Sequence, residues 1–232
     1  MESIKNDKET KFMNENYIPS TLNTLPTEIF IKICEIIPPE SLYVLSLVCR
    51  KFRNILWSFT SEYTQEIWRK SRLLYYPKIT LSPPKFINEQ RYIWLRVLSK
   101  TCEYCREFER SYFMIDIGIY WNFQVFACEN CIYERIISYR ELKKRGNFPM
   151  EILDCIPAIS YRNFSRKYFL TKDIEKAEKE YNSIKTNEDK LQWIFEKHND
   201  LKNMEKEIER HIEKDLEVRF NRQYDWCKKV DM

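Results

Sequence analysis

Two closely spaced cysteine pairs constrain the fold of this chain more than any other feature. Cys102-Glu-Tyr-Cys105 is followed, after 22 residues, by Cys128-Glu-Asn-Cys131. Each C-x-x-C can form a knuckle whose two thiolates point at one spot, and a hairpin between the knuckles would bring both pairs together. Four thiolates saturate zinc and leave no position for water. We therefore predict one structural, non-catalytic Zn²⁺ held by Cys102, Cys105, Cys128 and Cys131.

Two other interpretations of the cysteines remain open. A thiol–disulfide oxidoreductase carries its C-x-x-C at the start of a helix beside a parallel βαβ sheet. Cys128 and Cys131 do precede a predicted helix, but the sequence predicts no parallel sheet. The second alternative is that the two pairs are unrelated.

The scarcity of Gly and His excludes several enzyme classes. The 232 residues contain two Gly, Gly118 and Gly146, so neither a G-x-G-x-x-G fingerprint nor a P-loop can be written. The two His, His198 and His211, form no H-E-x-x-H pair, and we expect both on a solvated helix face. We predict no catalytic site, and hence that the chain is not an enzyme.

Charge and hydropathy patterns bear on compartment and partners. The net charge is +4, with basic and acidic residues interspersed, so nucleic acid is not an expected partner. The charge-free apolar stretch Ile117–Cys128 is far shorter than the roughly 20 residues that cross a bilayer, so no membrane partner is expected. Residues 1–20 are polar and aperiodic, which predicts a disordered leader without a signal sequence. We expect an intracellular protein, in the cytoplasm, the nucleus or both.

Residues 21–58 carry the pattern of two amphipathic helices. Pro26 fits the first turn of the first helix, Pro38-Pro39 ends that helix, and Ser41 fits the N-cap of the second. Two such short helices bury too little surface to be stable alone, so their apolar faces need a partner in this chain or in another.

Three short motifs in the same segment resemble the F-box, the helical module of F-box proteins. They are the opening Leu25-Pro26, Ser41-Leu42 at the start of the second helix, and the run Val48-Cys49-Arg50. Pro38-Pro39 stands where many members have Leu-Pro, and Phe52 stands where Trp is common. The resemblance implies docking on the Skp adaptor of a Skp–cullin–F-box ubiquitin ligase. The implied partner-binding face consists of Leu25, Pro26, Ile29, Ile33, Leu42, Leu45, Val48 and Phe52.

The order of the remaining segments is similar to that of a group of fungal F-box proteins. In that layout the F-box precedes helices, a Cys₄ zinc-knuckle pair, a helix, and a Tyr-Phe-Leu segment, here Tyr168-Phe169-Leu170. We expect a helical linker region over 59–100, a Cys₄ zinc ribbon plus helix over 101–146, and a helical region over 147–232.

Local patterns add detail to these regions. Alternation from Phe113 to Ala127 predicts two strands around a turn at Gly118–Asn122, and a helix is expected from about Asn130 to Arg145. A helix is expected from about Glu62 to Leu74, with Tyr63, Ile67 and Leu74 as core candidates, and Asn88 fits the N-cap of the next one. Gly146 fits the position just after the helix that ends near Arg145. Thr171 fits an N-cap, and a long charged helix is expected from near Asn187.

Together these features predict a mainly α fold with a small β-hairpin zinc ribbon. By resemblance, the chain would be the substrate-recognition subunit of a Skp–cullin–F-box ubiquitin ligase, presenting an unknown protein target through its zinc-stabilised C-terminal region. The alternative is a zinc-ribbon nucleic-acid-binding protein, whose affinity would fall steeply with salt.

Overall fold

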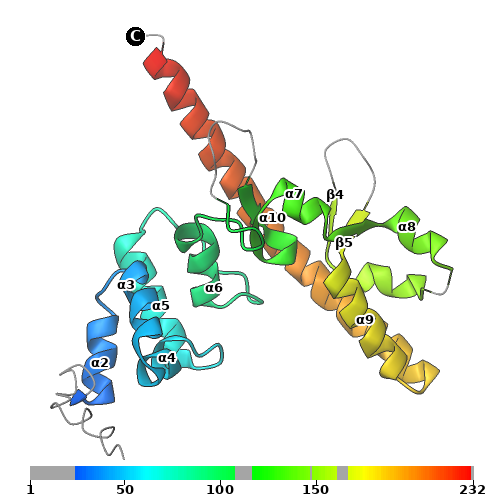
Figure 1. The fold of residues 1–232 in the computed structure, drawn as a ribbon, viewed down its shortest axis with the longest axis horizontal. Coiled ribbons are helices and arrows are strands. Elements are labelled where there is room, and N and C mark those ends of the chain that lie inside the picture. The colour runs from blue at the N-terminus through cyan, green and yellow to red at the C-terminus, as the bar shows by residue number, and fades with distance from the viewer. Residues whose placement is uncertain (1–23, 108–116, 147, 161–166, 231–232) are drawn as a thin grey trace, which may run out of the picture. The chain divides into compact units, whose positions relative to one another are not determined.

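The structure, a computed structural model, describes residues 24–107, 117–146, 148–160 and 167–230. It is mainly helical with two small antiparallel sheets, as predicted, and it divides into two compact units, Met1–Tyr75 and Tyr76–Met232 (Figure 1). The proposed leader, 1–20, and the strand residues Phe113 and Ile115 lie outside the described residues. Every helix in the described ranges is too short or too polar to span a membrane.

From residue 24 onward, the N-terminal unit contains four helices: α2 (Thr27–Cys34), α3 (Pro39–Val48), α4 (Arg50–Leu56) and α5 (Glu62–Tyr75). The prediction of one continuous second helix is wrong, because Cys49 adopts an extended conformation (φ −153°, ψ 165°) that separates α3 from α4. The Ser41 N-cap is also wrong: Pro38 occupies that position, and Pro39 begins α3, where its missing N–H costs nothing.

The core of this unit is closed by its own residues. Phe30 of α2 stacks on Phe52 of α4, with ring centroids 4.4 Å apart. The Trp68 indole N–H of α5 donates to the Leu56 carbonyl at 2.7 Å, and the Ser71 hydroxyl donates to the Ile37 carbonyl at 2.7 Å. α5 therefore belongs to this unit, whereas the sequence had placed its residues in a linker region over 59–100.

Two core candidates on α5 lie elsewhere than predicted. Tyr63 and Leu74 are exposed, and Ile67 alone of the three predicted residues is fully buried.

The C-terminal unit begins with a short helical segment and a hairpin. Asn88 caps α6 (Glu89–Ile93), as predicted, by accepting the Arg91 N–H, and the π-helical segment η1 (Trp94–Leu98) follows directly. β1 (Ile117–Tyr120) pairs antiparallel with β2 (Val125–Cys128), in register Ile117↔Cys128. The turn is η2 (Trp121–Phe123) plus Gln124 at φ 54°, so the expected turn at Gly118–Asn122 lies several residues too early.

A second sheet replaces parts of the predicted helices. The helix expected from Asn130 to Arg145 is divided into α7 (Glu129–Tyr133) and α8 (Tyr139–Lys144) by β3 (Ile136–Ser138). β4 (Ala158–Ser160) and β5 (Lys167–Leu170) lie within the region expected to be helical, and β5 pairs antiparallel with both β3 and β4. Ser138 begins α8 with a capping box to Glu141, and Gly146 follows α8 at φ 74°.

Three helical elements complete the unit: η3 (Met150–Cys155), α9 (Thr171–Ser183) and α10 (Asn187–Val230). The start of α10 confirms the prediction, but the N-cap of α9 is Leu170 rather than Thr171. The Thr171 hydroxyl instead donates to the Arg135 carbonyl at 3.0 Å. The hydrophobic face of α9 packs on η3 and β5 through Ile174 and Tyr181.

Candidate metal centre and docking surface

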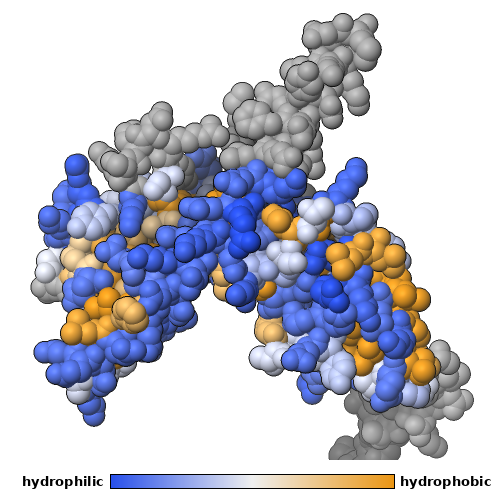
Figure 2. Space-filling model, turned by 180° about the vertical axis from the view of Figure 1, so that it is seen from behind, coloured by the Kyte–Doolittle hydropathy of each residue, from blue (hydrophilic) through white to orange (hydrophobic). Residues whose placement is uncertain are grey.

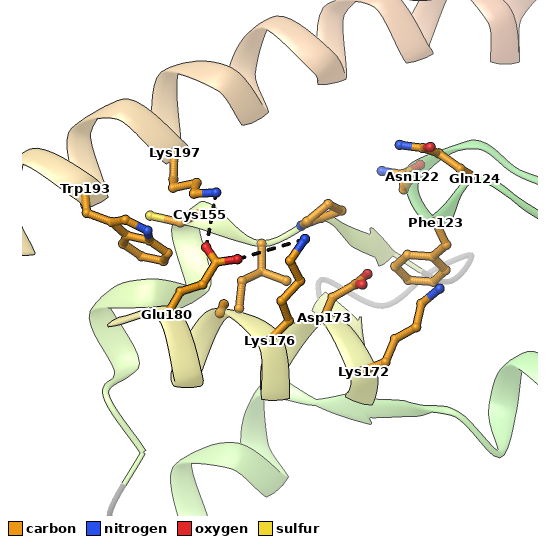
Figure 3. A pocket seen from close by; sticks show the side chains of 13 residues that line it. Asn122, Phe123, Gln124, Cys155, Lys172, Asp173, Lys176, Glu180, Trp193 and Lys197 are labelled. Atoms are coloured by element: carbon orange, nitrogen blue, oxygen red, sulfur yellow. Dashed lines mark ion pairs between the residues drawn. The ribbon is translucent and has the colours of Figure 1, made fainter. Parts of the chain in front are cut away.

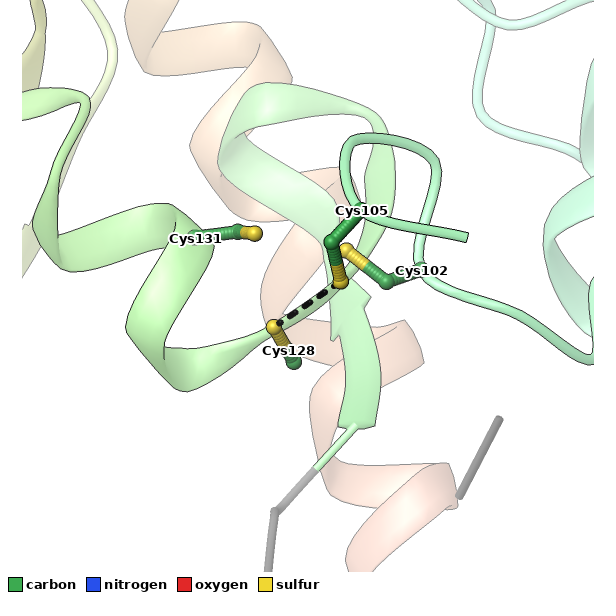
Figure 4. Close-up of side chains that lie close together, drawn as sticks. All are labelled: Cys102, Cys105, Cys128 and Cys131. Atoms are coloured by element: carbon green, nitrogen blue, oxygen red, sulfur yellow. Dashed lines mark hydrogen bonds between the residues drawn. The ribbon is translucent and has the colours of Figure 1, made fainter. Parts of the chain in front are cut away.

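The two cysteine pairs meet as the sequence predicted. The Sγ atoms of Cys102, Cys105, Cys128 and Cys131 all lie within 4.8 Å of one another (Figure 4). Cys105 Sγ and Cys128 Sγ are 3.8 Å apart. A tetrahedral ion with sulfur ligands at about 2.3 Å places neighbouring sulfurs roughly 3.8 Å apart. The cluster therefore has the donor set and nearly the spacing of a four-sulfur metal site.

Backbone structure explains how the pairs converge. β2 delivers Cys128, and α7 delivers Cys131 one turn later. The first knuckle is fastened to β2 because the Glu103 N–H donates to the Phe126 carbonyl, and the Glu103 carboxylate accepts the Phe126 N–H, both at 2.9 Å. Arg91 also donates to that carboxylate at 2.9 Å.

Arg135 links the two knuckles from the side. Its guanidinium donates to the Cys131 carbonyl at 2.8 Å and lies 4.2 Å from the ring centroid of Tyr104. Tyr104 is a spacer residue of the first knuckle, and Cys131 ends the second. One cation–π contact and one hydrogen bond therefore hold the spacing of the cysteine pairs without using a sulfur atom.

The thiols at this site do not ionise equally well by themselves. Burial opposes ionisation of Cys102, but hydrogen bonds from the backbone N–H groups of Cys105 and Cys128 outweigh it and lower the Cys102 pKa to about 6. Burial raises the pKa of the Cys128 thiol and that of the Cys131 thiol. Four neighbouring thiolates need a positive charge to offset the cost of ionising buried thiols, and a bound metal ion supplies that charge. The residues thus fit a metal ion.

The second candidate site is an apolar surface on the N-terminal unit. Val44, Leu47 and Val48 of α3 follow i, i+3, i+4 spacing, so they share one helix face, here named the α3 stripe. Their exposed fractions are 59%, 57% and 61%. Ile29 of α2 and Ile36 in the following turn are exposed by 50% and 64%. Figure 2 shows hydrophobic residues gathered on this unit, at the right of the view.

The eight residues of the implied partner-binding face occupy different environments. Leu42 and Phe52 are fully buried in this chain's own core, so neither offers surface to a partner here. Leu25, Ile33 and Leu45 are half-buried, whereas Pro26, Ile29 and Val48 are exposed. The sequence reading missed Val44 and Leu47, because periodicity identifies apolar faces without showing which one the chain covers itself.

An aromatic cluster in the C-terminal unit buries His211, which the sequence predicted to be solvated. His211 is only 4% exposed, so its prediction as a solvated residue is wrong. Its ring lies 4.9 Å from that of Trp121 and 5.5 Å from that of Tyr92. His198 lies nearer the surface, with Nδ1 2.9 Å from the Asp154 carbonyl oxygen.

Comparison with known proteins addresses the N-terminal unit. A family model described as F-box-like matches residues 22–70, a range that covers α2, α3, α4 and most of α5. Neither the curated proteins nor the solved structures returned a match. The match agrees with the Leu25-Pro26, Ser41-Leu42 and Val48-Cys49-Arg50 motifs. Residues 22–70 of this chain are therefore an F-box-like domain.

Proposed function

We propose that this chain is the substrate-recognition subunit of a Skp–cullin–F-box ubiquitin ligase. Its F-box-like domain would dock on the Skp adaptor, and its C-terminal unit would hold a target protein. The observation that carries the proposal is the exposed apolar surface of the F-box-like domain. Catalysis would belong to other subunits, and this chain would act by raising the effective concentration of target near the ubiquitin-charged enzyme.

The α3 stripe supports an adaptor-binding role on physical grounds. Burying one Val or Leu side chain is worth about 1.5–3 kcal/mol, so a stripe of three apolar residues can supply much of a docking energy. The core beneath it is already closed by Phe30, Phe52 and Trp68. The stripe is therefore free for a partner without rearrangement of the domain, and Ile29 and Val48 remain the residues of the implied face that best fit contact.

We further propose that the cysteine cluster binds one Zn²⁺ in a structural role. The support is the set of four sulfur ligands within 4.8 Å, because tetrahedral sulfur sites suit zinc and leave no position for a reacting water. Zinc would fix the hairpin β1–β2 and α7 to the segment that carries Glu103. The target-holding unit would thereby keep its shape.

Adaptor binding is tested with the purified full chain and a purified Skp adaptor. Leu47→Asp and Val48→Asp place charges on the α3 stripe and should weaken binding at least about tenfold, because an unpaired charge would be buried in the complex. Leu191→Asp is the matched control, since Leu191 lies in the C-terminal unit and is 68% exposed. Wild-type chain that fails to bind, or stripe variants that bind as tightly as the control, would reject the proposal.

A further inference from the structure

Two adjoining pockets run along one side of α10 in the C-terminal unit. The first has a volume of about 310 Å³ and is lined by residues of η2, α9 and α10 (Figure 3). The second has a volume of about 700 Å³ and extends toward Lys85 and Phe86. Cys155, Pro157 and Lys197 line both, so the two pockets form one continuous depression, here named the α10 groove.

The length of the α10 groove suits an extended peptide. It is lined by α10 residues from Trp193 to Arg210. At a rise of about 1.5 Å per helical residue, this stretch is roughly 25 Å long. An extended chain advances about 3.3 Å per residue, so about eight residues would fill the groove.

The groove carries more positive charge than it neutralises internally. Six basic and four acidic side chains line it. Glu180 of α9 pairs with Lys197 of α10 at 3.3 Å and with Lys176, one turn away on α9, at 3.9 Å, and Figure 3 shows both pairs. Among the basic residues that line the groove in the described part of the chain, those outside these ion pairs are Lys85, Lys172, Lys206 and Arg210. Positive charge outside these ion pairs therefore lies at two positions of the groove. Lys172 lies in the first pocket, and Lys85, Lys206 and Arg210 lie in the second.

The wider pocket also has an apolar floor. Phe86, Leu201 and Met204 are half-buried there, and Pro157 lies where the two pockets join. Lys206 and Arg210 follow Met204 on the same helix and are exposed. A ligand with a large apolar side chain beside an acidic one would therefore match both the floor and the rim of this pocket.

We propose that the α10 groove binds an extended acidic segment of a target protein, about eight residues long, that carries at least one large apolar side chain. This inference rests on the proposed function, since it assigns target recognition to a particular surface. The apolar side chain would occupy the floor formed by Phe86, Leu201 and Met204. Acidic side chains would pair with Arg210 and Lys206 at one end and with Lys172 at the other.

A peptide fits the groove better than a nucleic acid does. Asp173 and Glu180 line the first pocket, and Asp200 and Glu207 line the second. A nucleic-acid backbone carries a phosphate at every step, so it would meet these carboxylates along the whole groove. An acidic peptide can instead place uncharged residues opposite them and charged residues opposite the unmatched cations.

The test uses the full metal-loaded chain against a displayed library of random twelve-residue peptides. Enriched peptides should combine acidic and large apolar residues. One of them, labelled with fluorescein, is then titrated by fluorescence anisotropy. Lys206→Glu with Arg210→Glu should raise its Kd at least about tenfold, because the change replaces two attractions by two repulsions. Leu201→Ser should also weaken binding, through loss of the apolar floor.

The control double variant is Lys143→Glu with Lys144→Glu, which reverses two exposed charges on α8, outside the groove. It should change the Kd by less than about twofold. The inference is overturned if no peptide is enriched, if both double variants bind alike, or if a single-stranded RNA 20-mer binds the groove more tightly than the peptide. Binding of the Skp adaptor to the same groove variants is measured in parallel. Retained adaptor binding with no peptide enrichment would reject the groove and leave the proposed function intact.

Discussion

Acid should destabilise the C-terminal unit through one buried histidine. Burial, followed by the charge of Arg96, lowers the pKa of His211 from 6.5 to about 4. Arg96 lies on η1, with its guanidinium 3.2 Å from His211 Nδ1 and 2.6 Å from a carboxylate oxygen of Asp215. Because a guanidinium can only donate, Nδ1 accepts this hydrogen bond, and the ring is neutral with its proton on Nε2.

The size and sign of the effect follow from linkage. The unfolded chain binds a proton at His211 below pH 6.5, whereas the folded chain resists protonation until about pH 4. The stabilisation that comes from the neutral His211 is present above pH 6.5 and is lost as the pH falls from 6.5 to about 4. A shift of about 2.5 units corresponds to about 3 kcal/mol of unfolding free energy. The opposing charge of Asp215 is already included in this shift, as are the weaker contributions of Arg210 and Glu207.

Nuclear magnetic resonance measures the pKa directly, because the chain has only two histidines and a His198→Gln variant assigns their ring signals. Urea unfolding of wild type and His211→Gln, compared at about pH 7 and about pH 4.5, measures the energy. Gln is neutral throughout and can still accept from Arg96, so the loss between these two pH values should be smaller in the variant by about 2.5 kcal/mol. Any release of metal by acid affects both proteins and cancels in the comparison. A His211 pKa near 6.5, or equal losses in both proteins, would refute the reasoning.

Three further predictions concern stability. Elemental analysis should find one zinc per chain. Cys128→Ser should remove this zinc and lower the unfolding free energy, measured by urea denaturation, by more than about 3 kcal/mol. A metal-free chain of unchanged stability would contradict the structural role. Trp68→Phe removes the buried donor to the Leu56 carbonyl, so it should lower the unfolding free energy of the N-terminal unit by about 1–3 kcal/mol. Thermal unfolding measures this, and an unchanged melting temperature would show the expectation to be wrong. Ser138→Ala removes the capping box with Glu141 and should lower the unfolding free energy by about 1 kcal/mol. The control Ser183→Ala, at the end of α9 and outside any capping box, should lower it by less. Equal losses in the two variants would argue against the cap.

The sequence predicted features that depend on local chemistry. Four thiolates in two C-x-x-C pairs admit few arrangements, so the cysteine cluster could be predicted from spacing alone. Asn88 caps α6 and Gly146 follows α8 because a cap or a positive φ needs little more than its neighbours. The F-box-like domain could be recognised because its motifs keep their order along the chain.

Features that depend on distant partners were missed. β3 and β4 have three residues each, too few to show alternation, and they become strands because both pair with β5. Ile137 lies opposite Phe169, which is more than thirty residues away in the sequence. Likewise, Leu42 and Val44 have similar hydropathy, but only Leu42 faces the core that α5 completes. A helical periodicity alone cannot tell a face turned toward the chain itself from one left for a partner.

The packing of α5 onto α2, α3 and α4 affects how the chain behaves in solution when no partner is bound. Since the hydrophobic centre of the F-box-like domain is sealed from within, the unbound domain should remain folded while Val44, Leu47 and Val48 face water. Exposed apolar area of this kind promotes self-association. Chain produced without the proposed adaptor should therefore aggregate from the native state, without unfolding first, and co-production of that adaptor should keep it in solution.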